Sequence, residues 1–160
     1  MINQIVNRIA NTPTKKDTAL SILAQARQMI GVSPRAEDQN QWSVLLQIAG
    51  GYGKFEPNRG FEIVEPLIDQ LNEVFSAAQV LNGFGQNYFQ DGELTNANNL
   101  FNMTTQFGQT FGRLAMADFD RAKNDAERIR RPEVRVSVFL AMAQGLLNPN
   151  ARGGGPIYFN

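Results

Sequence analysis

The chain has 160 residues and a mass of 17.8 kDa, and its 42% hydrophobic and 19% charged residues give the composition of one folded domain. It carries 15 basic and 15 acidic residues, so no net charge draws the whole chain to nucleic acid or to an anionic membrane. It contains no histidine and no cysteine, which excludes Ser-His-Asp and Cys-His catalysis, His or Cys zinc sites, iron–sulfur clusters and disulfides.

The sequence also lacks the features of a targeted or membrane-spanning chain. Its start, Met1 to Gln4, has neither the basic residues nor the apolar run of a secretory signal. No uninterrupted apolar stretch approaches the roughly 18 residues that span a bilayer. We expect no membrane insertion, and the missing cysteines do not predict a compartment.

The first two predicted helices are marked by apolar residues at three- and four-residue spacing. This spacing gives one apolar face to a helix over residues 18–30, which Gly31 ends ahead of Pro34. The same spacing predicts a second helix from about residue 40 to 52, where a run of glycines ends it. Both segments are therefore predicted to be amphipathic helices.

A long third helix is predicted to begin at Pro57 and to carry an apolar stripe over residues 61–78. Pro66 lies inside this stripe. An internal proline removes a backbone donor and clashes with the preceding turn. We therefore expect a kink near residues 62–65, or a break into a short and a longer helix.

Residues 82–99 differ from the segments before them, because three glycines, five asparagines and two glutamines surround three aromatic residues. This composition predicts a loop. The aromatic residues Phe84, Tyr88 and Phe89 are candidates for binding a partner. The competing interpretation is that they fold back onto the helices, as aromatic residues under long loops usually do.

A fourth helix is predicted over residues 100–115, and a fifth follows over 122–129. The fourth contains Gly108 and Gly112, and each glycine costs roughly 1 kcal/mol relative to alanine inside a helix. Packing against other helices must therefore supply its stability. The two helices are either continuous or separated near Asp118.

The last predicted helix covers residues 134–147 and follows a break at Arg131-Pro132. Residues 148–160 contain three consecutive glycines and a proline, and this composition does not form regular structure. We therefore place one helical-repeat domain at residues 1–147 and an irregular tail at 148–160.

Three segments repeat one theme, in which large apolar residues precede a close-packing alanine. They are residues 20–24, 45–49 and 139–143. The repeat predicts that Ala49 and Ala143 lie at tight helix contacts. Helices that alternate in this way imply antiparallel hairpins that stack on one another. We predict an all-α fold of about six helices, a short α-solenoid without a sheet.

A family resemblance supports this architecture. The run from Arg131 to Arg135, Arg-Pro-Glu-Val-Arg, followed by apolar residues and Ala141, resembles the start of the second helix in a HEAT repeat. Trp42 and Leu45 have the first spacing of a tetratricopeptide repeat. The chain thus resembles a degenerate helical-hairpin repeat of the HEAT-like or tetratricopeptide-like kind. That resemblance implies a protein–protein scaffolding function.

Four carboxylates, Glu62, Glu65, Asp69 and Glu73, occur on the third helix with no lysine or arginine among them. Three of them follow at steps of four, so they form an acidic stripe that could ligate a hard cation or act as an acid and base pair. The competing interpretation is a solvated helix face, because metal sites in helix bundles draw ligands from facing helices. A carboxylate-dependent hydrolase or lyase is therefore the alternative function.

Positive charge gathers around the last helical hairpin. The residues are Arg121, Lys123, Arg128, Arg130, Arg131 and Arg135. Five acidic residues are interleaved with them and can pair with them locally. Nucleic-acid recognition normally requires an uninterrupted basic face, so we expect no nucleic-acid partner.

The leading interpretation is a non-catalytic module for protein–protein interaction or scaffolding, which binds another protein or its own copies. No catalytic residue, metal ligand, cofactor or small-molecule substrate is assigned. An enzyme would hold its carboxylates inward around a pocket with raised pKa values, whereas a scaffold would leave them exposed. The residues assigned to partner binding are Phe84, Tyr88, Phe89, Arg128, Arg131 and Arg135.

The N-terminal segment carries an apolar stripe without a polar cap before it, at Ile2, Ile5, Val6 and Ile9. A terminal solenoid repeat needs a polar outer side, and a helix of about ten residues is marginal by itself. We expect this stripe to be covered by a preceding repeat, by a second copy, or by the apolar residues at 157–159.

Overall fold

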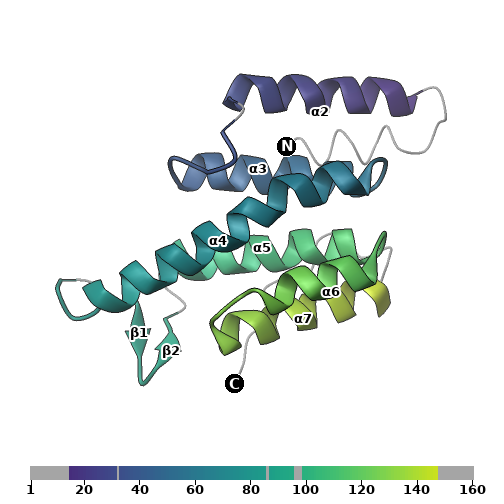
Figure 1. The fold of residues 1–160 in the computed structure, drawn as a ribbon. Coiled ribbons are helices and arrows are strands. Elements are labelled where there is room, and N and C mark those ends of the chain that lie inside the picture. The colour runs from purple at the N-terminus through teal and green to yellow at the C-terminus, as the bar shows by residue number, and fades with distance from the viewer. Residues whose placement is uncertain (1–14, 32, 86, 96–98, 148–160) are drawn as a thin grey trace.

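The computed structural model describes residues 15–31, 33–85, 87–95 and 99–147 (Figure 1). Within these ranges it contains six helices and one short hairpin. The helices are α2 (Lys16–Ile30), α3 (Gln39–Tyr52), α4 (Pro57–Leu81), α5 (Asn99–Ala115), α6 (Phe119–Glu127) and α7 (Pro132–Leu147), and the hairpin pairs β1 (Phe89–Gln90) with β2 (Glu93–Leu94). The predicted all-α class is confirmed, and the hairpin, with two residues in each strand, is the one departure from it. The apolar stripe predicted at Ile2 to Ile9 and the predicted tail at 148–160 lie outside the described residues.

The helices stack in two layers, as a short solenoid does. α3, α5 and α7 pack successively on one another, and α4 packs on α6 in front of them in the view of Figure 1. Each helix also contacts the next one along the chain. The structure therefore extends from α2 at one end to α7 at the other, with neighbours covering each other's apolar faces.

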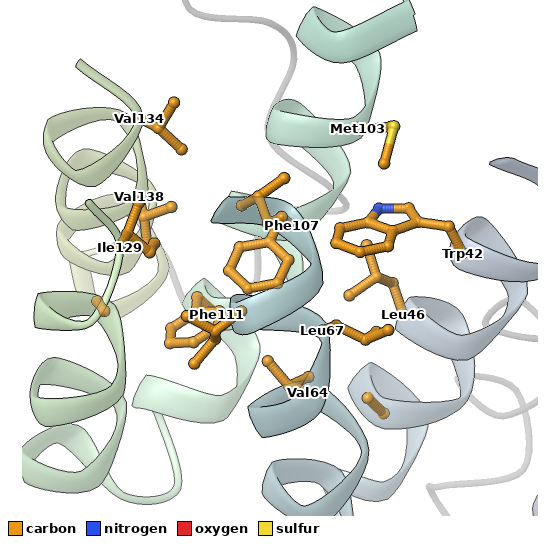
Figure 2. Close-up of a cluster of buried hydrophobic side chains, with 14 of the residues drawn as sticks. Trp42, Leu46, Val64, Leu67, Met103, Phe107, Phe111, Ile129, Val134 and Val138 are labelled. Atoms are coloured by element: carbon orange, nitrogen blue, oxygen red, sulfur yellow. The ribbon is translucent and has the colours of Figure 1, made fainter. Parts of the chain in front are cut away.

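Aromatic and aliphatic side chains fill the space between the helices. Trp42 on α3 stacks on Phe107 of α5 with ring centroids 5.8 Å apart, and Phe107 lies 4.9 Å from Phe111 (Figure 2). Val64 of α4 and Val138 of α7 complete this core from either side of α5. α5 is therefore the central helix of the core.

Two aspartates define the beginnings of helices. The Asp38 carboxylate accepts a hydrogen bond of 2.8 Å from the backbone N–H of Gln41, and Asp118 accepts one of 3.0 Å from that of Arg121. Both are N-caps, which supply an acceptor to a backbone donor that has no partner within its helix. The cap at Asp118 separates α5 from α6, so the two helices predicted there are not continuous.

Pro66 does not break the third helix, contrary to one of the two expectations from the sequence. α4 runs without interruption from Pro57 to Leu81. An internal proline costs about 3 kcal/mol, but Val64 before it and Leu67 and Ile68 after it are fully buried. Burial of this apolar stripe offsets the cost of the proline.

The glycines of α5 allow it to approach α7 closely. A Cβ atom on Gly112 would lie 2.7 Å from the carbonyl oxygen of Ala141, and one on Gly145 would lie 2.6 Å from the carbonyl oxygen of Gly112. A Cβ on Gly108 would lie 3.3 Å from the Cβ of Ala141. The two backbones are therefore in direct contact, and this packing compensates for the helix propensity that the glycines lack.

The alanine prediction is correct at one position and wrong at the other. Ala49 is fully buried, and its carbonyl oxygen lies 2.8 Å from the place that a Cβ on Gly60 would take. Ala143 is exposed, whereas Ala141, two residues earlier, makes the tight contact with α5. The repeat alignment misplaced the inward face of α7 because this helix is apolar on several sides.

We predict that Gly112→Ala lowers the free energy of unfolding by about 1–3 kcal/mol, although alanine is the better helix former by about 1 kcal/mol. The new methyl group would overlap the backbone of α7. Gly50→Ala is the matched control, because its new Cβ would meet only the Arg113 side chain, at 3.0 Å. Urea unfolding measures both. An equal effect of the two substitutions would contradict the backbone contact.

A second pair of variants tests the corrected alanine assignment. Ala49→Leu should overpack the core and lower the free energy of unfolding by about 1–3 kcal/mol. Ala143→Leu adds the same atoms at an exposed position and should change it by less than about 0.5 kcal/mol. Thermal unfolding at low protein concentration compares them, and a large loss for Ala143→Leu would restore the original alignment.

Candidate functional site

The acidic stripe of α4 is paired with arginines from other elements. Two of the arginines belong to α6 or its C-terminal end, and the third lies between α2 and α3. The pairs are Glu65 with Arg121 at 2.7 Å, Asp69 with Arg128 at 3.1 Å, and Glu73 with Arg35. The stripe therefore ties α4 to its neighbours in the stack.

These contacts favour the structural interpretation of the stripe over the catalytic one. A general acid at neutral pH needs a carboxyl group with a raised pKa. The hydrogen bond from Arg35 instead lowers the pKa of Glu73, and Glu62 and Asp69 are exposed. In the described part of the chain, no group of three or more acidic side chains lies close enough to hold a metal ion. The geometry lends no support to a carboxylate-dependent hydrolase or lyase.

One carboxylate of this region is buried. Asp125 on α6 lies 3.5 Å from the guanidinium of Arg128, and its Oδ2 atom has no hydrogen-bond partner among the described residues. Burial raises the pKa of Asp125, and the nearby charge of Glu65 raises it further. The folded protein therefore binds a proton at Asp125 more readily than the unfolded chain does.

We predict that Asp125→Asn stabilises the protein at pH 7 by about 1 kcal/mol, because it removes the charge from a buried side chain of the same shape. A raised folded pKa means that the contribution of Asp125 to stability is greatest below about pH 4 and falls as the pH rises. The advantage of the variant should therefore disappear at low pH.

Glu73→Gln is the control for this titration, because the folded pKa of Glu73 is lowered and the sign of the effect reverses. This variant should be less stable than wild type at neutral pH, and the difference should disappear as Glu73 becomes protonated in the wild type. Unfolding free energies between about pH 3 and 7 compare the two. Parallel pH profiles for the two variants would contradict the assignment.

Asn72 on α4 holds the connection between α6 and α7 in place. Its side-chain amide donates a 3.0 Å hydrogen bond to the carbonyl oxygen of Arg128, and its carbonyl oxygen accepts one of 2.9 Å from the backbone N–H of Arg130. The side chain is buried, so both its groups are used where water is excluded. This pair of bonds fixes the direction in which Arg131 leaves the connection.

Arg131 joins that connection to the hairpin. Its guanidinium carbon lies 4.1 Å from the ring centroid of Phe89 and 5.7 Å from that of Phe75, and Nη2 donates a 3.1 Å hydrogen bond to the carbonyl oxygen of Gly92. The two phenylalanine rings are 6.3 Å apart. Cation–π contacts of this kind contribute about 0.5–2 kcal/mol, so Arg131 holds the hairpin against α4.

The hairpin itself follows from a two-residue turn that was not predicted from the sequence. Asp91 and Gly92 have φ angles of 52° and 85°, and positive φ at both central residues is the requirement of a type I′ turn. Asn82, at the end of α4, accepts a 3.0 Å hydrogen bond from the backbone N–H of Phe89. The Asp-Gly pair was the signal that could have predicted these strands.

The six residues assigned to partner binding occupy different environments. Tyr88 and Phe89 are half-buried and pack against the core, which is the placement that the competing interpretation expects. Phe84 is 82% exposed. Arg128 and Arg131 make the intramolecular contacts described above. Arg135 is half-buried on α7, and no carboxylate of the described ranges lies within 4.0 Å of it.

Phe84 belongs to a larger apolar surface, which we call the α4-end patch. It consists of Val80, Leu81 and Phe84, which are 74%, 51% and 82% exposed. Val80 and Leu81 lie in the last turn of α4 and Phe84 follows three residues after its end, and no charged residue occurs between Glu73 and Asp91. Val80 and Leu81 were not among the residues assigned to partner binding, although this uncharged stretch was a signal for them.

A shallow depression of about 280 Å³ lies between α4 and the α6–α7 connection. Its lining combines one aromatic ring with amide, hydroxyl and charged groups. The lining residues are Asn72, Phe75, Ser76, Gln79, Arg130, Arg131, Pro132 and Glu133. Gln79 directly precedes the α4-end patch, so depression and patch follow one another along α4.

Comparison of the chain with family models, with curated proteins and with solved structures finds no match. Over the residues that the structure describes, no helix has the length and apolar character needed to cross a membrane.

Proposed function

We propose that this protein is a non-catalytic protein-interaction module and that the α4-end patch, with the adjoining depression, is its binding surface. The observation that carries the proposal is the exposure of three large apolar side chains within five residues, Val80 and Leu81 in the last turn of a long helix and Phe84 just after it. Single exposed apolar residues are normal, whereas a contiguous apolar surface with a polar rim marks an interaction site.

The patch is supported from both sides. α4 is anchored to α6 and to the connection before α3 by its ion pairs, and Asn82 and Arg131 fix the hairpin beside the helix end. A surface that is ordered before binding loses less conformational entropy when a partner docks. Full burial of a large apolar side chain contributes roughly 1.5–3 kcal/mol, so three such residues suffice for a binding hot spot.

The surface also suggests the chemistry of its partner. The patch requires apolar side chains from the partner, because it presents no hydrogen-bonding side chain of its own. Arg130 is exposed at the edge of the depression, where a carboxylate of the partner can reach it. We therefore propose a protein partner whose apolar residues lie beside an acidic one.

The resemblance to HEAT-like or tetratricopeptide-like repeats supports the same class of function. Stacked helical hairpins expose long surfaces for protein partners, and the two layers seen in this chain are stacked in that way. The support is an analogy at the level of the fold, whereas the α4-end patch is specific to this chain.

The test is quantitative capture of partners by the full chain, by a Val80→Ser/Phe84→Ser variant and by a Met29→Ser control. Met29 is 87% exposed on α2, so the control removes an equally accessible apolar side chain from another surface. We expect wild type and control to capture the same protein from an extract of the source cells. The dissociation constant of that protein, measured with purified components, should rise at least about tenfold for the double variant.

Unchanged affinity of the double variant would contradict this binding surface. Circular dichroism and thermal unfolding must show that the double variant folds as wild type does. Both replaced residues are exposed, so we expect their stability effect to stay within about 0.5 kcal/mol.

A further inference from the structure

α7 is apolar on two opposite faces. Its inner face, with Val134, Val138 and Met142, is buried in the stack. Its outer face carries a second row at steps of four, three and four residues, which we call the α7 seam. The seam consists of Val136, Leu140, Ala143 and Leu147, and all four are exposed.

Among the described helices, the seam lies at one end of a helix layer. α5 has α3 on one side and α7 on the other, whereas α7 packs within this layer on α5 alone among the described helices. A helix that is apolar all round is normally buried on all sides, and the outer helix of a stack normally has a polar outer face. We therefore expect another apolar surface to pack against the seam.

The pattern of the seam shows what can cover it. Apolar residues at three- and four-residue steps are the pattern by which one helix packs along another. No charged residue occurs between Arg135 and the end of α7, so the covering surface must itself be apolar and uncharged. The α7 seam of a second copy has this spacing and this chemistry.

We propose that two copies of the chain pair through their α7 seams about a twofold axis, with the two helices antiparallel. In a twofold interface the same residues from both copies meet, so a charged seam would bring like charges together, and this one has none. The chain also has no net charge, so copies do not repel one another at long range.

The sizes of the side chains favour the antiparallel arrangement. Antiparallel pairing with residues 141 and 142 at the axis places Leu140 opposite the partner's Ala143, and Val136 opposite the partner's Leu147. Each large residue then meets a smaller one, which is how well-packed helix interfaces interdigitate. A parallel pair in register would instead place Ala143 against the partner's Ala143 and leave space there.

The dimer is expected to be weak. The seam and its flanking residues Phe139 and Leu146 are far fewer than the roughly 20–30 residues that each partner contributes to a stable interface. We expect a dissociation constant in the micromolar range, and hence a molar mass that depends on concentration. The seam shares no residue with the α4-end patch, so each proposal can fail without the other.

Sedimentation equilibrium of the full chain between about 1 µM and 1 mM tests the pairing. We expect the mass to rise from 17.8 kDa towards twice that value. A Leu140→Gln/Leu147→Gln variant should shift the midpoint of this rise at least tenfold to higher concentration, whereas Phe84→Gln should leave it unchanged. The unfolding transition at low concentration checks that each variant folds.

Introduced cysteines test the antiparallel register, because the chain has none of its own. When Leu140→Cys and Ala143→Cys chains are mixed and oxidised, the mixed disulfide should form faster than either disulfide between identical chains. A Phe84→Cys chain should not cross-link efficiently with either. Preferential coupling of two Leu140→Cys chains would overturn the antiparallel arrangement.

Two results would overturn the pairing itself. One is a molar mass that stays at the monomer value up to about 1 mM. The same result is expected if residues 148–160 of the same chain, and not a second copy, cover the seam. The other is an association that survives the Leu140→Gln/Leu147→Gln changes.

Discussion

The direct contact between the backbones of α5 and α7 is the constraint on which the C-terminal half of the structure depends. Gly112 and Gly145 leave no room for a Cβ atom, so the distance between these helices is set by main-chain atoms. Because α7 is held this closely, its inner face has a fixed position against α5. The end of the α6–α7 connection that leads into α7 is fixed with it. Asn72 fixes the other end of that connection from α4. Because both ends of the connection are fixed, the side chain of Arg131 extends to the hairpin beside α4, where it contacts Phe89 and Gly92.

The charges of this chain act locally. Equal numbers of acidic and basic residues leave no net charge, and all three carboxylates of the acidic stripe, Glu65, Asp69 and Glu73, have an arginine from another element. Exposed pairs of this kind contribute only about 0–1 kcal/mol each, so they do not decide the stability of the fold. Their effect is to fix how α4 sits against its neighbours, and α4 carries the patch proposed to bind a partner.

Helical spacing in the sequence was sufficient to predict the six helices and their stacked arrangement, because each helix buries one apolar face. The spacing failed where a helix is apolar on more than one side. In α7 it placed Ala143 inside, whereas Ala141 faces α5, since nothing in the pattern distinguishes the inner row from the outer one. It also did not show that α4 continues through Pro66, because that outcome depends on tertiary burial on both sides of the proline.

The candidate site was predictable only in part. The exposed position of Phe84 agrees with a role in binding. A sequence cannot show, however, that the guanidinium of Arg131 already contacts Phe89 and Gly92, residues about forty positions away. The signals that were present and missed are local ones: the Asp91-Gly92 turn, and the absence of charge around Val80 and Leu81. Contacts between distant segments decide which arginines and aromatic residues remain accessible, and helical spacing carries no information about them.

The two proposed surfaces have a joint consequence for affinity. A dimer paired through α7 would carry two α4-end patches, because the seam and the patch share no residue. A partner with two suitable apolar segments, or a partner that is itself dimeric, would then bind its second site at an effective concentration set by the geometry of the dimer. Weak binding at each patch would become tight binding by the pair, provided that the spacing of the partner's sites matches. Loss of the α7 contact would then weaken partner binding without changing a single residue of the binding surface.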